Sequence, residues 1–375
     1  MNRTSRPLGL IAIFVVLVLA FDAHPRSAPQ PRPKSDPVLG ERIAEGVVLD
    51  GRLWLRGTLG KNTFGDRSGG LVSLGLADES RRVHFERNVL SVVKDGRDLW
   101  VLRWSSLSKR KFVVSRWRSG SFEDVGEFES FKGDVPLALL TNGGAVTVLT
   151  ESTIRVLTSN GEWKSVPLKN RLRLGIQSAI ASPTLGGSIY VGTNNGEWGG
   201  GLQRVDLRSG AVTKIERRDG KGLCDGPLNS DCDPVTGVIA DPQMKECVLA
   251  SVGLVHLFTS SGRILRVCEE KVTVISEKSV SRAEKDKRKM TEAFFGLARA
   301  AEGGGFWAIT WRALYRFDAD GHQEGEYALP KLKPVSGIYL SHELPGAVVV
   351  RTDVNWSVST SGYTPLVIPL DSSRP

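Results

Sequence analysis

The sequence predicts an all-β fold in which seven four-stranded antiparallel sheets close into a ring, a seven-bladed β-propeller with insertions on one face. A short apolar phrase recurs seven times, and its copies lie about 40 to 60 residues apart, a period typical of propeller blades. The copies are Leu53–Leu55, Leu99–Val101, Val146–Val148, Ile189–Val191, Val248–Ala250, Phe306–Ala308 and Val348–Val350.

Each repeat contains the same succession of strands and turns. The third repeat shows it without insertions, as Ala145–Thr150, then Thr153–Gly161, then Glu162–Leu168. Alternation of apolar and polar residues with a period of two predicts strands, and the Asn-Gly pair at 160–161 predicts a hairpin turn. The same frame fits Phe306–Leu329 and Ala347–Leu370.

The strand that precedes the phrase carries a small residue at one register, at Gly237, Gly296 and Gly337. Small residues suit the innermost strand of a propeller, because the blades converge there and their backbones crowd. Residues 291–302 have a composition that also suits a helix, but Gly296 fits the strand register and we predict a strand. Only residues 279–290 are expected to form a short helix.

The N-terminus has the features of a secretory signal peptide over residues 1–24. Arg3 and Arg6 precede an apolar run, and Val18-Leu19-Ala20 suits cleavage after residue 20. The run is shorter than the roughly 18 residues that a membrane span needs, so we expect an exported protein, periplasmic or extracellular, with no span after cleavage. The alternative is a chain tethered to the membrane by an uncleaved segment.

The rest of the chain divides into three parts. Residues 25–38 are rich in proline and predict a disordered spacer, because they offer no apolar face to bury. Residues 39–370 carry the repeats and form one propeller domain. Residues 371–375 are expected to be a disordered tail.

Four cysteines, Cys224, Cys232, Cys247 and Cys268, lie close together in the sequence. Export makes disulfides the expected state, and three pairings are open. Zinc is the alternative, but the cysteines lack CxxC spacing and His256 is the only histidine nearby.

The formal net charge is +9, part of which lies in the predicted signal and spacer. An excess of positive charge of this size, spread over a large surface, mainly favours solubility and gives weak support for an anionic partner. The charged run at 282–289 mixes both signs and has no interleaved aromatics, so it predicts a solvated loop and no nucleic-acid partner. We expect a monomer.

The phrases Ile189–Thr193 and Gly201–Asp206 carry a resemblance that extends over residues 42–370. This pattern resembles the β-propeller superfamily, especially bacterial repeats of the two-component-regulator and YVTN types. It lacks the Trp-Asp dipeptide of WD repeats, the paired glycines of kelch repeats and the sialidase box. The resemblance therefore implies a fold, whereas function depends on the site.

The resemblance also implies which face carries a site. In propellers, the loops from the second to the third strand and the loops between blades open on the same face, where ligands usually bind. Long loops are often functional, although mobile filler is the alternative. The long loops here are residues 60–69, 105–111, 194–200, 217–233 and 277–291.

Two of these loops supply candidate ligand-binding residues. In Asn194–Gly201, an exposed tryptophan among glycines is able to stack on a sugar or an aromatic ligand, while nearby polar residues add contacts. A plain glycine-rich hairpin loop is the alternative. The candidates are Asn62, Phe64, Asp66 and Arg67 in the first loop, and Asn195, Glu197 and Trp198 in the fourth blade.

Metal and catalytic signals are weak. Asp225, Asp231 and Asp233 offer oxygen ligands of the kind that calcium takes, but their spacing is not that of an EF-hand, and a solvated acidic loop pinned by a disulfide is the alternative. We expect no other cofactor. No motif links a histidine to a serine or cysteine nucleophile, so no catalytic residue is assigned. The histidines considered are His84, His256, His322 and His342.

Three functions fit these observations. The first is a non-enzymatic recognition or scaffold module of the cell envelope, which binds a glycan, a peptide or an envelope protein through its insertion-bearing face. The second is a propeller hydrolase or lyase that acts on a polysaccharide or a small lactone, with carboxylates such as Glu197 and Asp66 converging. The third is a structural subunit of an envelope complex.

Overall fold

The computed structural model describes residues 38–39, 42–58, 68–78, 80–106, 110–131, 134, 136–142, 144–158, 160–175, 177–181, 187–222, 224–256, 259–280, 290–300, 304–329, 337–344, 347–353 and 366–369. The predicted signal peptide, the spacer up to residue 37 and the tail lie outside them. Within these ranges the fold is all-β, and its one helical segment is the short 3-10 turn η2 (Gly196–Trp198). No helix in the described part of the chain is long and apolar enough to cross a membrane.

The first sheet has seven strands in chain order. They are β1 (Arg42–Leu49), β2 (Arg52–Thr58), β3 (Gly69–Gly75), β4 (Arg81–Asp95), β5 (Asp98–Ser106), β6 (Lys111–Arg118) and β7 (Ser121–Glu129). Strand β4 pairs with β3 through its first part, up to Val89, and with β5 through its second part, from Val89 onward. The chain changes course between the two parts, where Asn88 has a positive φ of 74° and the register shifts.

Four sheets of four antiparallel strands follow, and a three-stranded sheet completes the described chain. The four-stranded sheets begin with β8 (Pro136–Asn142), β9 (Ala145–Thr150), β10 (Thr153–Leu157) and β11 (Trp163–Pro167), then β12 (Gln177–Ala181), β13 (Ser188–Asn194), β14 (Gly200–Asp206) and β15 (Val212–Ile215). Next come β16 (Val235–Ala240), β17 (Cys247–His256), β18 (Thr259–Cys268) and β19 (Lys271–Ser276), then β20 (Leu297–Arg299), β21 (Phe306–Ile309), β22 (Ala313–Phe317) and β23 (Gln323–Ala328). The last sheet contains β24 (Gly337–Leu344), β25 (Ala347–Asp353) and β26 (Leu366–Pro369).

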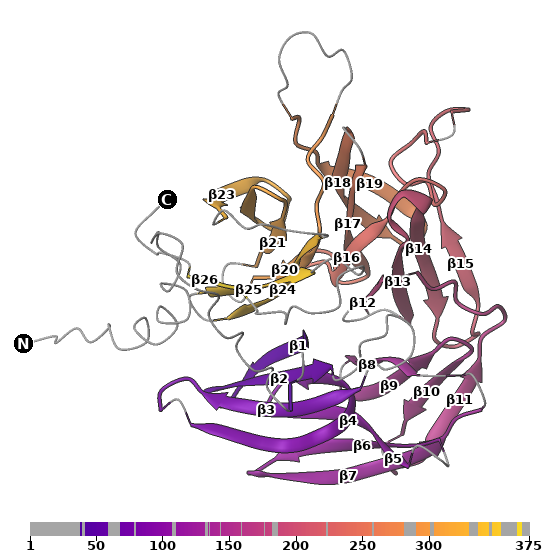
Figure 1. Cartoon of the computed structure of the whole chain (residues 1–375). Helices are drawn as coiled ribbons and strands as arrows, with labels where there is room; N and C mark the ends of the chain where they lie inside the picture. Colours follow the sequence, from indigo (N-terminus) through magenta and orange to yellow (C-terminus); the bar gives the residue numbers. More distant parts are fainter. Residues whose placement is uncertain are drawn as a thin grey trace, which may run out of the picture.

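The sheets follow one another around a centre with their first strands innermost (Figure 1). Strand β1 pairs with β2 and also lies against β24, so the first and last sheets meet at their inner strands. Among the other inner strands, β12 contacts β16, β16 contacts β20 and β20 contacts β24. This circular order of antiparallel sheets is the predicted propeller arrangement.

Every copy of the apolar phrase lies on an interior strand of its sheet, which explains its composition. In β13 and β21 the middle residue faces the next sheet and its neighbours face the previous one, so these strands are apolar on both sides. Tyr190 packs in a cluster with Val248 of the next sheet, while Ile189 packs with Ile154 of the sheet before. Trp307 likewise packs with Val348 of the next sheet, and Phe306 with Leu249 of the previous one.

The innermost strands approach closely enough to require small residues, as the sequence predicted. A Cβ atom at Gly237 of β16 would lie 2.8 Å from the backbone nitrogen of Leu297 in β20. The Thr236 hydroxyl donates a hydrogen bond to the backbone oxygen of Phe294, 2.7 Å away. The chain from residue 290 to 300 is not helical, but its strand is limited to β20 and starts at Leu297, later than expected. The helix expected at 279–290 falls mostly on residues 281–289, outside the described residues.

A cross-strand contact that the sequence analysis missed recurs on the third strands. An arginine there lies opposite the middle residue of the phrase, as Arg116 does to Trp100 and Arg316 does to Trp307. Their guanidinium carbons lie 5.4 Å and 5.6 Å from the two indole rings, within cation–π range. Arg266, opposite Leu249, instead binds the fully buried carboxylate of Asp241 at 2.6 Å.

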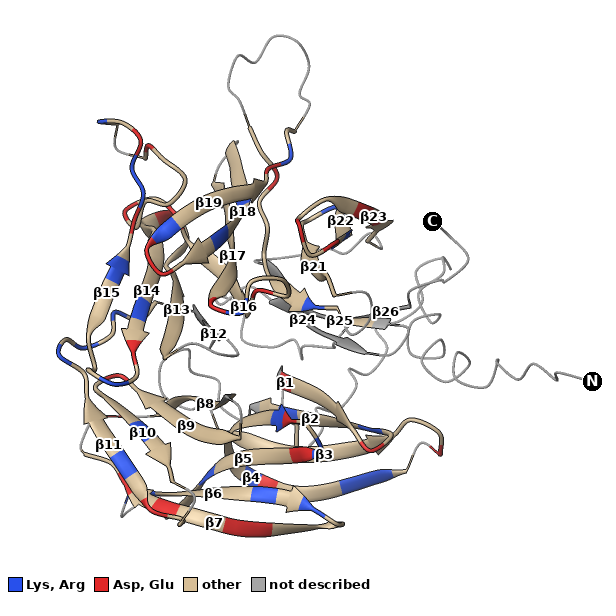
Figure 2. Ribbon diagram, turned by 180° about the vertical axis from the view of Figure 1, so that it is seen from behind, with Lys and Arg blue, Asp and Glu red and all other residues tan. Residues whose placement is uncertain are grey.

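Charges on the outer strands largely compensate one another. Figure 2 shows acidic residues of β7 next to basic residues of the neighbouring strand β6. Arg103 pairs with Asp124 at 2.7 Å, and Arg116 pairs with Glu123 at 3.0 Å. These ion pairs offset part of the basic charge of this sheet.

The aromatic cluster around His84 leads to a prediction on pH. Burial, together with the positive charge of the nearby Arg52, lowers the pKa of His84 to about 4. The ring stacks on Trp54, with 4.4 Å between centroids, so the native state favours the neutral imidazole. In the unfolded chain His84 binds a proton as the pH falls below about 6.5, whereas in the native chain it does so only near pH 4. The free energy of unfolding therefore decreases as the pH falls from about 6.5 to about 4.

We expect the free energy of unfolding, measured by denaturant titration, to fall between pH 6.5 and 4 by more in the natural protein than in a His84→Phe variant. Phenylalanine keeps the ring stack, and the Ser73 hydroxyl, which contacts the His84 ring, still accepts from Arg52 Nε at 2.9 Å. Parallel pH curves for the two proteins would show that His84 does not cause the loss.

Candidate functional site

The predicted Trp198 loop forms a short, well-defined turn between β13 and β14. The Asn194 Oδ1 atom accepts a hydrogen bond from the Gly196 backbone N–H at 2.8 Å, and Asn195 accepts one from the Trp198 N–H at 3.3 Å. These bonds hold η2, in which the Trp198 side chain is 77% exposed. Asn195, Glu197 and Trp198 therefore share one turn, while Asn62, Phe64, Asp66 and Arg67 lie outside the described residues.

The connection between β15 and β16 supports this turn from one side, and Figure 1 shows it extending beyond the sheets. The Gly200 N–H donates to the backbone oxygen of Ser230, and the Gly201 N–H donates to that of Asp233, both at 2.9 Å. A disulfide joins Cys224 to Cys232 within the same connection. We call the face on which these two connections lie the insertion face.

The four cysteines form two disulfides, which selects one of the three pairings left open. Besides Cys224–Cys232, Cys247 is bonded to Cys268, directly opposite it on β17 and β18. All four cysteines are thus oxidised, and none is a thiolate ligand for zinc.

The three carboxylates considered for calcium each have another partner. Asp231 pairs with Arg218 at 2.7 Å, and Asp225 accepts from the Gly222 N–H at 2.6 Å. Asp233 pairs with Arg263 at 2.5 Å; burial raises the pKa of Asp233, and Arg263 opposes that rise. Within the described ranges these carboxylates do not form a group of ligand atoms close enough to share one ion.

Glu197 and His256 connect the Trp198 turn to the next sheet. The Glu197 Oε2 atom lies 2.6 Å from His256 Nδ1, and the two side chains are 42% and 43% exposed. His256 ends β17, so this contact joins η2 to the β17–β18 hairpin. Val255, beside it in the chain, is 46% exposed.

A cleft continues from this hairpin to the turn between β21 and β22. It has a volume of about 220 Å³. Its lining includes Val255, Ser260, Met290, Glu292 and Trp311. The cleft therefore lies on the insertion face, between the sheet that contains β17 and the sheet that contains β21. Val255, which lines it, is the residue before His256 of the Glu197–His256 pair.

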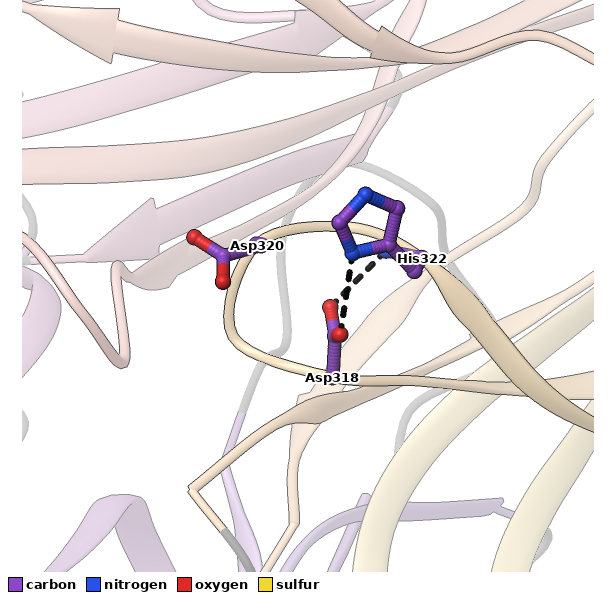
Figure 3. A group of neighbouring side chains, drawn as sticks. All are labelled: Asp318, Asp320 and His322. Atoms are coloured by element: carbon purple, nitrogen blue, oxygen red, sulfur yellow. Dashed lines mark hydrogen bonds and ion pairs between the residues drawn. The ribbon is translucent and has the colours of Figure 1, made fainter.

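One further group of possible metal ligands lies on the opposite face, in the turn between β22 and β23. Asp318, Asp320 and His322 have ligand atoms within 4.8 Å of one another (Figure 3). The Asp318 carboxylate already accepts from the backbone and contacts the ring of His322, and the Asp320 Oδ1 atom accepts from Gln243. Hydrogen bonds within the turn and to its neighbour account for this geometry.

The structure contains a serine–histidine contact that the sequence did not reveal, at Ser73 and His84. The Ser73 Oγ atom lies 2.8 Å from His84 Nε2, but Ser73 is fully buried and also accepts from Arg52. A buried hydroxyl in this position is unable to attack a substrate. The side chain of His342 lies outside the described residues.

Sequence reasoning missed most of the residues that line the cleft. Val255 lies near the end of β17, whereas Glu292 and Trp311 belong to two later connections, and no spacing relates them. Trp311 lies two residues after β21, in the turn to β22, and a tryptophan in such a turn is the one signal that was available.

Comparison with known proteins supports the fold alone. No family model matches the chain, and no curated protein matches it. The solved structure of YCF48 bound to a D1 peptide is similar, with a TM-score of 0.51, 12% identity, and coverage of 92% of this chain and 99% of that one. The chain has a β-propeller fold.

Two further solved structures are similar to this propeller at lower TM-scores. The β-propeller domain of the Trilobed protease from Pyrococcus furiosus has a TM-score of 0.49 and 11% identity, and the match covers 90% of this chain and 95% of that one. The GH74 xyloglucanase from Xanthomonas campestris has a TM-score of 0.48 and 14% identity, with coverage of 83% and 50%.

The fit of the Trp198 turn onto its support gives a prediction. A Cβ atom at Gly199 would lie 2.4 Å from the backbone oxygen of Ser230, and its φ of +78° disfavours any other residue. We expect Gly199→Ala to lower the melting temperature by more than Gly196→Ala. At Gly196 φ is also positive, +62°, but a Cβ would meet nothing within 4 Å, so only about 1–2 kcal/mol of backbone strain applies. Equal effects in thermal unfolding would show that the turn does not rest on Ser230.

The partners of the three aspartates give a second prediction. Because Arg218, Arg263 and the Gly222 N–H already satisfy them, we expect a calcium chelator to leave the melting temperature unchanged. Native-state binding of calcium would raise that temperature in a concentration-dependent way. A rise on adding calcium that EDTA reverses would contradict this expectation.

Proposed function

We propose that this chain is a recognition propeller that binds a protein or peptide segment on its insertion face. The observation that supports it most directly is the 77% exposed side chain of Trp198, held on a supported turn beside a cleft. Phe131, in the connection between β7 and β8 on the same face, is 76% exposed. Exposed aromatic anchors are typical of the residues that contribute most to protein interfaces.

We also propose that the ring has seven blades. Strand β4 then belongs to two of them, its first part as the outer strand of blade one and its second part as the inner strand of blade two. The seven phrases support this count, since each lies on a separate second strand: β2, β5, β9, β13, β17, β21 and β25.

Export to the periplasm or the extracellular space is part of the proposal. Its support is the signal-like N-terminus together with the two disulfides, which persist in oxidising compartments.

Recognition is favoured over the hydrolase or lyase alternative by the state of Glu197. A catalytic carboxylate pair needs two groups that converge on a substrate bond. Glu197 instead contacts His256 at the surface. Peptide binding is recorded for YCF48, so a propeller of similar extent is able to present a peptide-binding surface.

The test is a screen of the full chain against arrays of envelope-protein peptides and of glycans, followed by variants. We expect Trp198→Ala to weaken binding to the selected peptide by about 30-fold or more, because truncation of an anchor of this kind costs about 2 kcal/mol or more. Glu197→Gln is expected to have a smaller effect. Met244→Ala, at an exposed apolar residue in the turn between β16 and β17 on the opposite face, is the matched control.

Binding to glycans alone, or turnover of a bound polysaccharide that Glu197→Gln abolishes, would overturn the proposal in favour of the alternatives. Equal losses for Trp198→Ala and Met244→Ala would show that the insertion face is not the binding surface.

A further inference from the structure

The size of the cleft between the β17–β18 hairpin and Trp311 limits what it is able to bind. Pockets for whole small-molecule ligands measure about 300–1,000 Å³. At about 220 Å³ this cleft is smaller, and it suits one side chain contributed by a larger partner. Its walls include apolar atoms of Val255, Met290 and Trp311, which suit an extended aliphatic stem.

A carboxylate in the cleft gives it a charge preference. The Glu292 Oε2 atom accepts a hydrogen bond from the Tyr315 hydroxyl at 2.8 Å. Burial raises the pKa of Tyr315, and Glu292 raises it further, so the phenol keeps its proton and remains a donor. In the described part of the chain, no arginine or lysine forms an ion pair with Glu292, so its charge is available to a ligand.

The neighbouring cations are engaged elsewhere or exposed. The Lys278 ammonium lies 3.6 Å from the centre of the Tyr315 ring and donates to Gln323 and Glu326. Arg312 lines the cleft but is exposed to solvent.

We propose that the cleft binds a lysine side chain of the partner segment, with its stem against Met290 and Trp311 and its ammonium at Glu292. An ammonium next to a carboxylate makes a charge-assisted hydrogen bond, and an indole face adds cation–π attraction. This inference rests on the proposed function, because it assigns the chemistry of one contact made by the same insertion face.

The experiment uses the full chain labelled with 13C at its methionine methyl groups, of which there are three. Met290 lines the cleft, and Met244 lies on the opposite face as an internal control. Titration with Nα-acetyl-lysine amide should shift the Met290 methyl signal, identified with Met290→Leu, with a dissociation constant of about 1 mM, and should leave Met244 unchanged. Nα-acetyl-norleucine amide is the matched neutral probe and should bind at least about tenfold more weakly.

The variant Glu292→Gln should weaken binding of the lysine probe by about tenfold or more. Glutamine still offers an oxygen to the Tyr315 hydroxyl, so the variant is expected to fold, and its melting temperature checks this. Equal binding of the lysine and norleucine probes would overturn the proposal. So would an unchanged affinity in a folded Glu292→Gln variant, or a Met290 shift with Nα-acetyl-glutamate amide alone, which would indicate that Arg312 selects an anion.

This test is independent of the partner screen. If the lysine probe does not bind but Trp198→Ala still weakens peptide binding, only the assignment of the cleft is overturned. Failure of both would overturn the recognition function as well.

Discussion

The apolar contact between successive sheets is the interaction on which the rest of this structure depends. Strand β13 is buried on both faces, so Tyr190 packs forward against Val248 while Ile189 packs backward against Ile154. Removing a large buried side chain from such a layer costs about 2–5 kcal/mol, a large part of the stability of an ordinary domain. The repeats of this chain therefore differ from one another mainly in the length and composition of the connections between their strands. The insertion face consists of such connections.

The same constraint explains which parts of the fold the sequence predicts. A strand that is apolar on both sides and recurs at blade spacing gives a signal that local propensity does not obscure, and all seven phrases lie on interior strands of their sheets. The small residues of the inner strands were predictable for a related reason, since Gly237 has no room for a Cβ atom. The passage of β4 from one pairing partner to the next was not predictable, because it occurs within one continuous strand, next to Asn88 with its positive φ, and no break in composition marks it.

Only those residues of the candidate site that lie together in one loop were predictable from the sequence. Trp198 and Glu197 stand together in one glycine-rich turn, so their composition was visible in the sequence. Their surroundings come from other parts of the chain: His256 ends a strand of the next sheet, and Glu292 and Trp311 lie on two later connections. Such a group exists only after the sheets have packed side by side, and no spacing within one segment encodes it. The recurrent arginines opposite Trp100 and Trp307 were missed for a similar reason, because their pairing is across strands.

The support beneath the Trp198 turn bears on how the insertion face would bind. Two backbone hydrogen bonds join Gly200 and Gly201 to a connection that the Cys224–Cys232 disulfide closes, so the turn has its shape before any partner arrives. Immobilising a side chain or loop at an interface costs about 0.5–1.5 kcal/mol for each flexible side chain, and a surface that is already ordered avoids part of this cost. A weak contact, such as one lysine in a small cleft, is then able to add to the affinity that Trp198 provides, because the two sites sit on adjacent, already packed sheets.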